Sequence, residues 1–207
     1  MFPINIFLSH FVSDYAFTNV YSEKFLDKSD YYKHIIWFLL VFLAFNFDML
    51  NGWAALVVIG SLLLHTGIDI YRIKKQKANF YIELIFLGIF FLISYVFRNL
   101  FLNSFLSNVF QLYIVGMVVA TSFGSFLFRT FNVLKKEEKD TIGASERLAI
   151  FIFILAQQYL WVLIAIGAGI AYKLLFVKEK NFKEMIFSPT YAIITSLLWL
   201  ILMLGIF

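Results

Sequence analysis

The sequence predicts an all-α integral membrane protein with about six transmembrane helices and a shorter membrane-embedded helix at its N-terminus. Apolar residues make up 62% of the 207 residues and charged residues only 14%, which lies outside the balance of a water-soluble domain. The apolar residues form runs about as long as a bilayer core requires, and Lys and Arg gather at the ends of these runs. A soluble fold of this length would also lack the interior volume to bury 27 Phe, 11 Tyr and 4 Trp.

Six apolar segments are long enough, or nearly so, to span a membrane as helices, in which every backbone group is hydrogen-bonded internally. They cover residues 32–47, 53–72, 79–98, 105–130, 147–174 and 187–207. A shorter apolar helix is expected at 3–22. It is kept as part of the mature protein because it has neither the basic start nor the small-residue cleavage site of a signal peptide. Pro189 falls in the first turn of the last segment, where a helix tolerates proline.

Polar stretches separate these segments. The most hydrophilic of them is the run KKEEKD at Lys135–Asp140, which reads as a solvated loop. It divides an N-terminal helical part, residues 1–134, from a C-terminal helical pair, residues 145–207. We expect the two parts to pack as one membrane domain, because nothing in the sequence marks a separate soluble domain.

The positive charges predict the orientation, since cytoplasmic loops carry the excess of Lys and Arg. If the segments alternate, one side collects twelve cations: Lys24, Lys28, Lys33, Arg72, Lys74, Lys75, Lys77, Arg129, Lys135, Lys136, Lys139 and Arg147. The other side collects five: Arg98, Lys173, Lys178, Lys180 and Lys183. The richer side is therefore predicted to face the cytoplasm, with the chain in a bacterial inner membrane and its C-terminus on the cytoplasmic side.

Several functional classes are excluded by composition and motif. The 17 Lys and Arg form no single basic stripe, so nucleic acid is not an expected partner. With no Cys in the chain, a metal ion would have to be held by nitrogen and oxygen ligands. The nucleotide loop, HExxH and GxSxG motifs are also absent from the sequence.

All three histidines lie in the first third of the chain, and two of them are followed by aspartate four residues later. His10 precedes Asp14 and His65 precedes Asp69, while the whole chain contains only six Asp. Residues four apart share one face of a helix, so each HxxxD pattern places an imidazole beside a carboxylate. His34 is the third histidine.

These five side chains are expected at one depth in the membrane. His65 and Asp69 lie within seven residues of Arg72, and His34 directly follows Lys33, at the cytoplasmic ends of their helices. Glu83, six residues after Lys77, enters its helix from the same side. The sequence therefore predicts one polar cluster near the cytoplasmic side of the bilayer.

We expect this cluster to bind a divalent metal ion through His10, Asp14, His34, His65 and Asp69. Imidazoles and carboxylates suit Zn²⁺ best here, with Mn²⁺ and Fe²⁺ as alternatives. Asp14, Asp69 or Glu83 would act as general base. The opposing interpretation is that each His–Asp pair is a local hydrogen bond that joins helices without any metal.

The same motifs carry a resemblance to a known family. LSHFVSDYAF at 8–17, YKHIIW at 32–37 and LLLHTGIDIYRIK at 62–74 resemble an uncharacterised family of bacterial polytopic membrane proteins, a domain of unknown function with an HxxxD...H...HxxxD pattern. IGASERLAIFIFILAQQY at 142–159 and YAIITSLLWLIL at 191–202 look like the C-terminal half of its longer members.

The resemblance implies roles for the same His and Asp residues and also for Glu146, Arg147 and Gln157. The chain departs from the family pattern at Ser13 and Thr18, where the family has Gly and Gln. No activity is implied by the resemblance itself.

From the chemistry of the cluster, the preferred function is a membrane-embedded metal-dependent hydrolase. It would act on a lipid or amphiphilic phosphoester at the cytoplasmic leaflet. A cation or proton transporter could use the same cluster. A non-catalytic membrane partner or effector subunit, in which the polar cluster is structural, is the third interpretation. Whether the chain binds a protein partner or forms a homo-oligomer is left open by the sequence.

Overall fold

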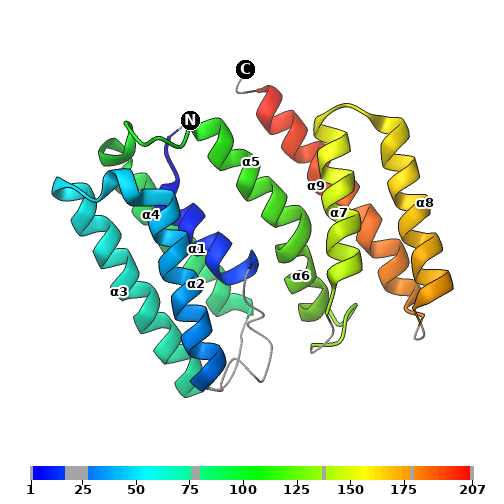
Figure 1. The fold of residues 1–207 in the computed structure, drawn as a ribbon, viewed down its shortest axis with the longest axis horizontal. Coiled ribbons are helices and arrows are strands. Elements are labelled where there is room, and N and C mark those ends of the chain that lie inside the picture. Colours follow the sequence, from blue (N-terminus) through cyan, green and yellow to red (C-terminus); the bar gives the residue numbers. More distant parts are fainter. Residues whose placement is uncertain (1, 17–27, 76–79, 137–138, 178–179, 206–207) are drawn as a thin grey trace. The chain divides into compact units, whose positions relative to one another are not determined.

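The computed structural model describes residues 2–16, 28–75, 80–136, 139–177 and 180–205, all of which lie in helices or in the turns between them (Figure 1). The α-helices are α1 (Asn5–Ala16), α2 (Lys28–Asn46), α3 (Gly52–Lys75), α4 (Phe80–Val96), α5 (Asn108–Val118), α6 (Gly124–Thr130), α7 (Thr141–Leu155), α8 (Tyr159–Phe176) and α9 (Phe182–Leu204). Short 3₁₀ turns follow α2 and α4, and a π-helical segment, Val119–Phe123, joins α5 to α6.

The chain folds as two compact units, Met1–Val115 and Gly116–Phe207. The division falls within α5, upstream of the hydrophilic loop Lys135–Asp140 where the boundary was predicted. Each unit has its own hydrophobic core.

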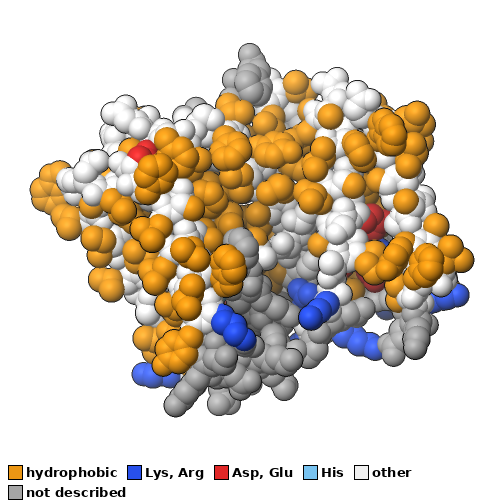
Figure 2. Space-filling model, in the orientation of Figure 1, with side chains coloured by type: hydrophobic (Ala, Val, Ile, Leu, Met, Phe, Trp, Pro, Cys, Tyr) orange, Lys and Arg blue, Asp and Glu red, His pale blue; other side chains and the backbone are white. Residues whose placement is uncertain are grey.

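Five helical stretches within the described residues are long and apolar enough to cross a membrane. They are Tyr31–Met49, Gly52–Lys74, Asn108–Thr130, Tyr159–Phe176 and Phe182–Leu204, and α4 is a shorter apolar helix. Large hydrophobic side chains lie exposed along these stretches, including Leu63, Leu163 and Leu175. Figure 2 shows the same surface, where hydrophobic side chains cover the visible face of α2 and α3. Such a surface is stable in lipid rather than in water.

The N-terminal helix α1 is the centre of the first unit and packs against α2 and α4. Ten of its twelve residues are buried, and at about 18 Å it is too short to cross a bilayer core. A helix start buried in this way needs acceptors for its free N–H groups. Gln111 Oε1 accepts from the amide of Ile4 (2.7 Å), and Ser94 Oγ accepts from the amide of Phe7 (2.8 Å). The predicted helix 3–22 is thus confirmed over 5–16, and residues 17–22 lie outside the described residues.

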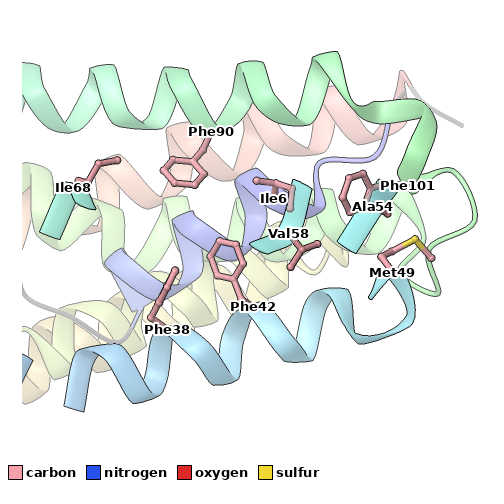
Figure 3. Packing of buried hydrophobic residues seen from close by; sticks show 9 residues of the cluster. All are labelled: Ile6, Phe38, Phe42, Met49, Ala54, Val58, Ile68, Phe90 and Phe101. Atoms are coloured by element: carbon pink, nitrogen blue, oxygen red, sulfur yellow. The ribbon is translucent and has the colours of Figure 1, made fainter. Parts of the chain in front are cut away.

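The core of the first unit forms where α1, α2, α3 and α4 meet. Figure 3 shows Ile6 of α1 facing Phe42 of α2, Val58 of α3 and Phe90 of α4. Phe38 continues this core one turn further along α2. The hydrophobic core directly contacts the polar cluster, because Phe38 stacks on His65 and Phe90 stacks on His10.

In the second unit, the prediction of a single helix over 147–174 is wrong, because the chain forms two helices there. Helix α7 ends at Leu155 and α8 begins at Tyr159. Gln157 adopts φ +58°, and the amides of Gln158 and Gln157 donate to the carbonyls of Phe153 and Ile154. This is the Schellman pattern that ends a helix, with glutamine at the left-handed position that glycine usually occupies.

The break turns the chain back on itself. Lys173, near the end of α8, donates to Glu146, near the start of α7, with Nζ–Oε2 2.7 Å. It also pairs with Glu184 in the first turn of α9. The end of α8 therefore lies beside the start of α7, whereas a single helix over 147–174 would have put these two positions at its opposite ends.

Gly116 is required by close packing on α9. A Cβ at this position would overlap the indole ring of Trp199, so we expect Gly116→Ala to lower the free energy of unfolding by about 1–3 kcal/mol. Gly88→Ala is the matched control, because Gly88 is also helical and a Cβ there meets no atom within 4 Å. Thermal unfolding in detergent measures both variants. Equal stability of the two would contradict the packing.

Candidate metal centre

Seven ionisable side chains from four helices meet at one end of the first unit's core. Helix α1 carries His10 and Asp14, α2 carries His34, α3 carries His65, Asp69 and Arg72, and α4 carries Glu83. All seven are buried, with exposed fractions of at most 6%. Ionisable groups buried in a membrane protein are costly unless they are paired, so their collection in one place marks a candidate functional site.

Three of these side chains form a triangle of potential metal ligands. His34 Nε2 and His65 Nε2 lie 3.4 Å apart, and each lies 3.2 Å from Asp69 Oδ2. Neighbouring ligands around a tetrahedral Zn²⁺, at bond lengths of about 2.0–2.1 Å, are about 3.3–3.4 Å apart. The three donor atoms thus have the mutual spacing of one face of such a site. They come from two helices, and the i, i+4 pair on α3 supplies two of them.

Asp14 faces the same donor atoms from α1. Its Oδ1 lies 3.2 Å from His65 Nε2 and 3.9 Å from His34 Nε2. This oxygen is buried and accepts no hydrogen bond from a described residue. A buried carboxylate oxygen without a donor is unusual, and this oxygen could serve as a further metal ligand.

Arg72 holds the carboxylates from the outer side. Its Nη1 donates to Asp14 Oδ2 (2.8 Å) and to Asp69 Oδ1 (3.0 Å). The oxygens that Arg72 binds are therefore not the ones that face His34 and His65. Its other edge binds Glu83 with two hydrogen bonds, Nε to Oε1 (3.1 Å) and Nη2 to Oε2. The guanidinium consequently fixes which oxygen of each aspartate points inward.

His10 contacts the cluster through His65 and lies further from the carboxylates. The two Nδ1 atoms are 2.8 Å apart, which is a hydrogen bond in which one nitrogen is protonated. The distance from His10 Nδ1 to Asp14 Oδ2 is 3.8 Å. If the Nε2 of His65 is left free to bind a cation, its proton resides on Nδ1 and His10 Nδ1 accepts it.

Among the described residues, the charge of the cluster is unbalanced. Asp14, Asp69 and Glu83 in their ionised forms, with Arg72, leave a formal charge of −2. Burying such an excess is unfavourable, and either one divalent cation or protons on two of the imidazoles would cancel it. The spacing of the donor atoms and the excess of acidic charge are both compatible with a divalent cation between the histidines and aspartates.

The five residues predicted as ligands are thus brought together, and two groups of three, His10–Asp14–His65 and His34–His65–Asp69, have donor atoms close enough for a metal ion. Glu83 lies behind Arg72 instead of beside the histidines. Sequence reasoning missed the role of Arg72, which was counted only as an orientation signal. Its position three residues after Asp69, on the same face of α3, could have indicated the pairing.

The second unit holds a separate buried network around Arg147. This side chain is fully buried and donates to the carbonyls of Ala120 and Thr121 in the π-helical segment, at 3.0 and 2.9 Å. It also binds Asp140 Oδ2 and Ser125 Oγ, both at 2.6 Å. The neighbouring Glu146 pairs with Lys173. Glu146 and Arg147, singled out by the resemblance, therefore join helices, while Gln157 lies at the helix break.

Comparisons with known proteins give no independent assignment. No family model, no curated protein and no solved structure matches this chain.

Removing Arg72 should leave three carboxylates buried together. We expect Arg72→Met to lower the free energy of unfolding by about 3–5 kcal/mol, the usual result of removing one partner of a buried ion pair. Arg98→Met serves as the control, because Arg98 contacts the Tyr95 carbonyl and ring outside the cluster and should contribute less than about 1 kcal/mol. Unfolding in detergent is the measurement, and equal effects would show that Arg72 is not the organising charge.

Proposed function

We propose that this protein is a membrane-embedded metal-dependent hydrolase whose metal ion, Zn²⁺, is held by His34, His65 and Asp69. The observation that supports it is the triangle of donor atoms, whose sides of 3.2–3.4 Å suit a tetrahedral ion. Two histidines, one carboxylate and an open fourth position are typical of catalytic zinc sites. The same ligand set also suits Fe²⁺ and Mn²⁺, so elemental analysis decides the identity of the ion.

Within this proposal, Asp14, Arg72 and Glu83 have separate roles. A zinc ion with one open position supplies Lewis acidity and activates water for hydrolysis. Asp14 Oδ1, which has no hydrogen-bond donor among the described residues, would accept the proton of that water as general base. Arg72 positions Asp14 and Asp69, and Glu83 positions Arg72.

His10 is proposed as a positioning residue in place of a direct ligand. Its Nδ1 lies 2.8 Å from His65 Nδ1; in the proposed tautomer it would accept a hydrogen bond from His65 and so keep the Nε2 of His65 deprotonated. Its ring stacks on Phe90 with 3.9 Å between centroids, which fixes its orientation. This assignment revises the expectation that all three histidines bind the ion.

The depth of the cluster favours an amphiphilic substrate. His34 lies near the start of the apolar stretch Tyr31–Met49, and Asp69 lies near the end of Gly52–Lys74. The site is therefore close to the membrane surface, where lipid headgroups are presented. We propose a lipid or an amphiphilic phosphoester as the substrate.

A cation or proton transporter is the second candidate, and one observation favours it. Neutral polar side chains continue from α1 toward the other end of the first unit. Asn46 donates to Ser9 Oγ (2.8 Å), Gln111 donates to Asn5 Oδ1 (2.9 Å), and Asn5 donates to Ser104 Oγ (2.8 Å). Such buried polar groups can relay a proton or a cation. Cation flux into proteoliposomes that is lost in His65→Ala, without any bound metal, would support this function instead.

We also propose a revised orientation. Because α8 runs back toward the start of α7, Lys173 and the lysines after it join the basic side that the sequence assigned to the cytoplasm. Helix α9 begins beside Lys173 and is long enough to cross the membrane, so the C-terminus would lie on the opposite side. This replaces the expected cytoplasmic C-terminus and strengthens the asymmetry of positive charge.

The metal and the hydrolysis can be tested separately. Purified wild-type protein should contain about one equivalent of zinc, and His65→Ala and Asp69→Asn should lose it. Asp14→Asn should keep the metal but reduce hydrolysis of bis-p-nitrophenyl phosphate and of a labelled phospholipid panel by about 10²–10⁴-fold, the usual contribution of a general base. His10→Phe is expected to weaken zinc affinity about 10–100-fold.

Three results would redirect the proposal. Loss of zinc in Asp14→Asn would make Asp14 a ligand, not the base. Zinc without turnover of any phosphoester, together with tolerance of His-to-Gln changes, would indicate a structural cluster. Absence of metal from wild-type protein purified without chelator would remove the hydrolase altogether.

The orientation can be tested directly because the chain contains no cysteine. Single variants Gly205→Cys and Lys183→Cys can therefore be labelled with a membrane-impermeant maleimide. Gly205→Cys should be labelled in intact cells and Lys183→Cys only after permeabilisation. Labelling of both only after permeabilisation would return the C-terminus to the cytoplasm.

A further inference from the structure

The first unit carries an apolar groove of about 680 Å³ on its surface, separate from the buried metal centre. One wall is a single face of α3, because the lining residues follow Trp53 by three, four, seven and eight positions: Leu56, Val57, Gly60 and Ser61. The other wall is the end of α4 with the 3₁₀ turn after it, including Ile93 and Asn99. Apart from Ser61 and Asn99, the lining consists of apolar residues and glycine, so the groove suits an apolar occupant.

Gly60 keeps the groove open on the α3 side. A Cβ at this position would meet no atom within 4 Å. Trp53 and Leu56 are exposed and lie in a helix long and apolar enough to cross a membrane. The molecules that surround such side chains in a bilayer core are lipid acyl chains, so an acyl chain is available to fill the groove.

The dimensions of the groove favour an acyl chain over a second helix. Trp53 and Ser61 are eight residues apart, which sets the length of the groove along α3 at about 12 Å. Divided by this length, the volume of about 680 Å³ gives a mean cross-section of about 60 Å². A helix with its side chains is about 10–12 Å across and needs about 80–110 Å². A transmembrane helix from a partner or a second copy is therefore too wide to lie in the groove.

The groove leads toward the metal centre along both of its walls. On α3, Ser61 precedes His65 by four residues and so shares its face of the helix. On α4, Ile93 follows Phe90 by three residues, and Phe90 stacks on His10. One end of the groove thus lies about one helical turn, about 5 Å, from the cluster. The other end, at Trp53, lies at the far end of the apolar stretch Gly52–Lys74.

We propose that this groove holds an acyl chain of the lipid whose headgroup is hydrolysed at the metal centre, an assignment that rests on the proposed function. The bilayer interior is as apolar as the groove, so the hydrophobic effect adds little affinity. The contribution is orientation, because a chain fixed between α3 and α4 holds the attached headgroup near the ion. The groove therefore makes the enzyme selective for substrates with a long acyl chain.

Photo-crosslinking of the full chain in a non-ionic detergent tests occupancy of the groove without any need for turnover. The probes are phosphatidylglycerol and phosphatidylethanolamine that carry a diazirine in the middle of one acyl chain. Peptide mass spectrometry should find the label on residues 53–61 and 93–100 in excess over α8. Helix α8 is the reference surface, because side chains such as Leu163 and Leu175 are also exposed there.

Gly60→Leu fills the groove without displacing any atom that a Cβ would meet. It should lower labelling of the groove about tenfold, and kcat/KM for a long-chain phospholipid by the same factor. Hydrolysis of bis-p-nitrophenyl phosphate, which has no acyl chain, should stay unchanged. Gly88→Leu is the matched control, because Gly88 is an equally open helical glycine that does not line the groove, and it should behave like wild type.

The outcomes separate this proposal from the hydrolase itself. Labelling of the groove that Gly60→Leu abolishes, in a protein that hydrolyses no phosphoester, would support the acyl-chain site while the proposed function fails. Equal labelling of the groove and α8, or an equal loss in Gly60→Leu and Gly88→Leu, would overturn the acyl-chain site. A dimer of the wild-type chain that Gly60→Leu dissociates, with no label in the groove, would overturn it in favour of a second copy.

Discussion

The structure of the first unit depends on how one buried guanidinium is paired. Arg72 of α3 binds Asp14 of α1, Asp69 of its own helix and Glu83 of α4, so a single charge connects three helices. The fourth helix joins through His34, which contacts Asp69. Because a planar guanidinium donates along fixed directions, it also determines which carboxylate oxygens remain turned toward the histidines.

This arrangement explains why the cluster is suited to a cation. Arg72 neutralises only part of the acidic charge and occupies only the outer oxygens of the two aspartates. The inner oxygens lie within 3.2 Å of an imidazole Nε2 of His34 or His65, with Phe38 and Phe90 stacked against the rings of His65 and His10. A buried, aromatic surrounding strengthens electrostatic attraction between the charged groups. The metal centre and the proton transporter are two interpretations of the same excess of acidic charge in the cluster.

The second unit satisfies a buried arginine by other means. Arg147 donates hydrogen bonds to two backbone carbonyls of the π-helical segment Val119–Phe123 and to the carboxylate of Asp140. A π-helical turn offsets carbonyl groups from the regular ladder and so provides acceptors that an α-helix would keep to itself. With Asp140 Oδ2 committed in this way, the start of α7 has no side-chain capping hydrogen bond.

The sequence by itself determined that the protein is helical and that several of its segments are apolar enough to cross a membrane. It also placed a His and an Asp four residues apart on one face of α1 and of α3, because these properties follow from run length and helical periodicity. Only the tertiary structure decided the break at Gln157, where glutamine fills a left-handed position without a glycine to signal it, and hence the direction of α8. It also decided that Arg72 belongs to the cluster and that His10 lies closer to His65 than to a carboxylate. Contacts between helices depend on how each helix is rotated and offset against its neighbours, and periodicity along one chain carries no information about either.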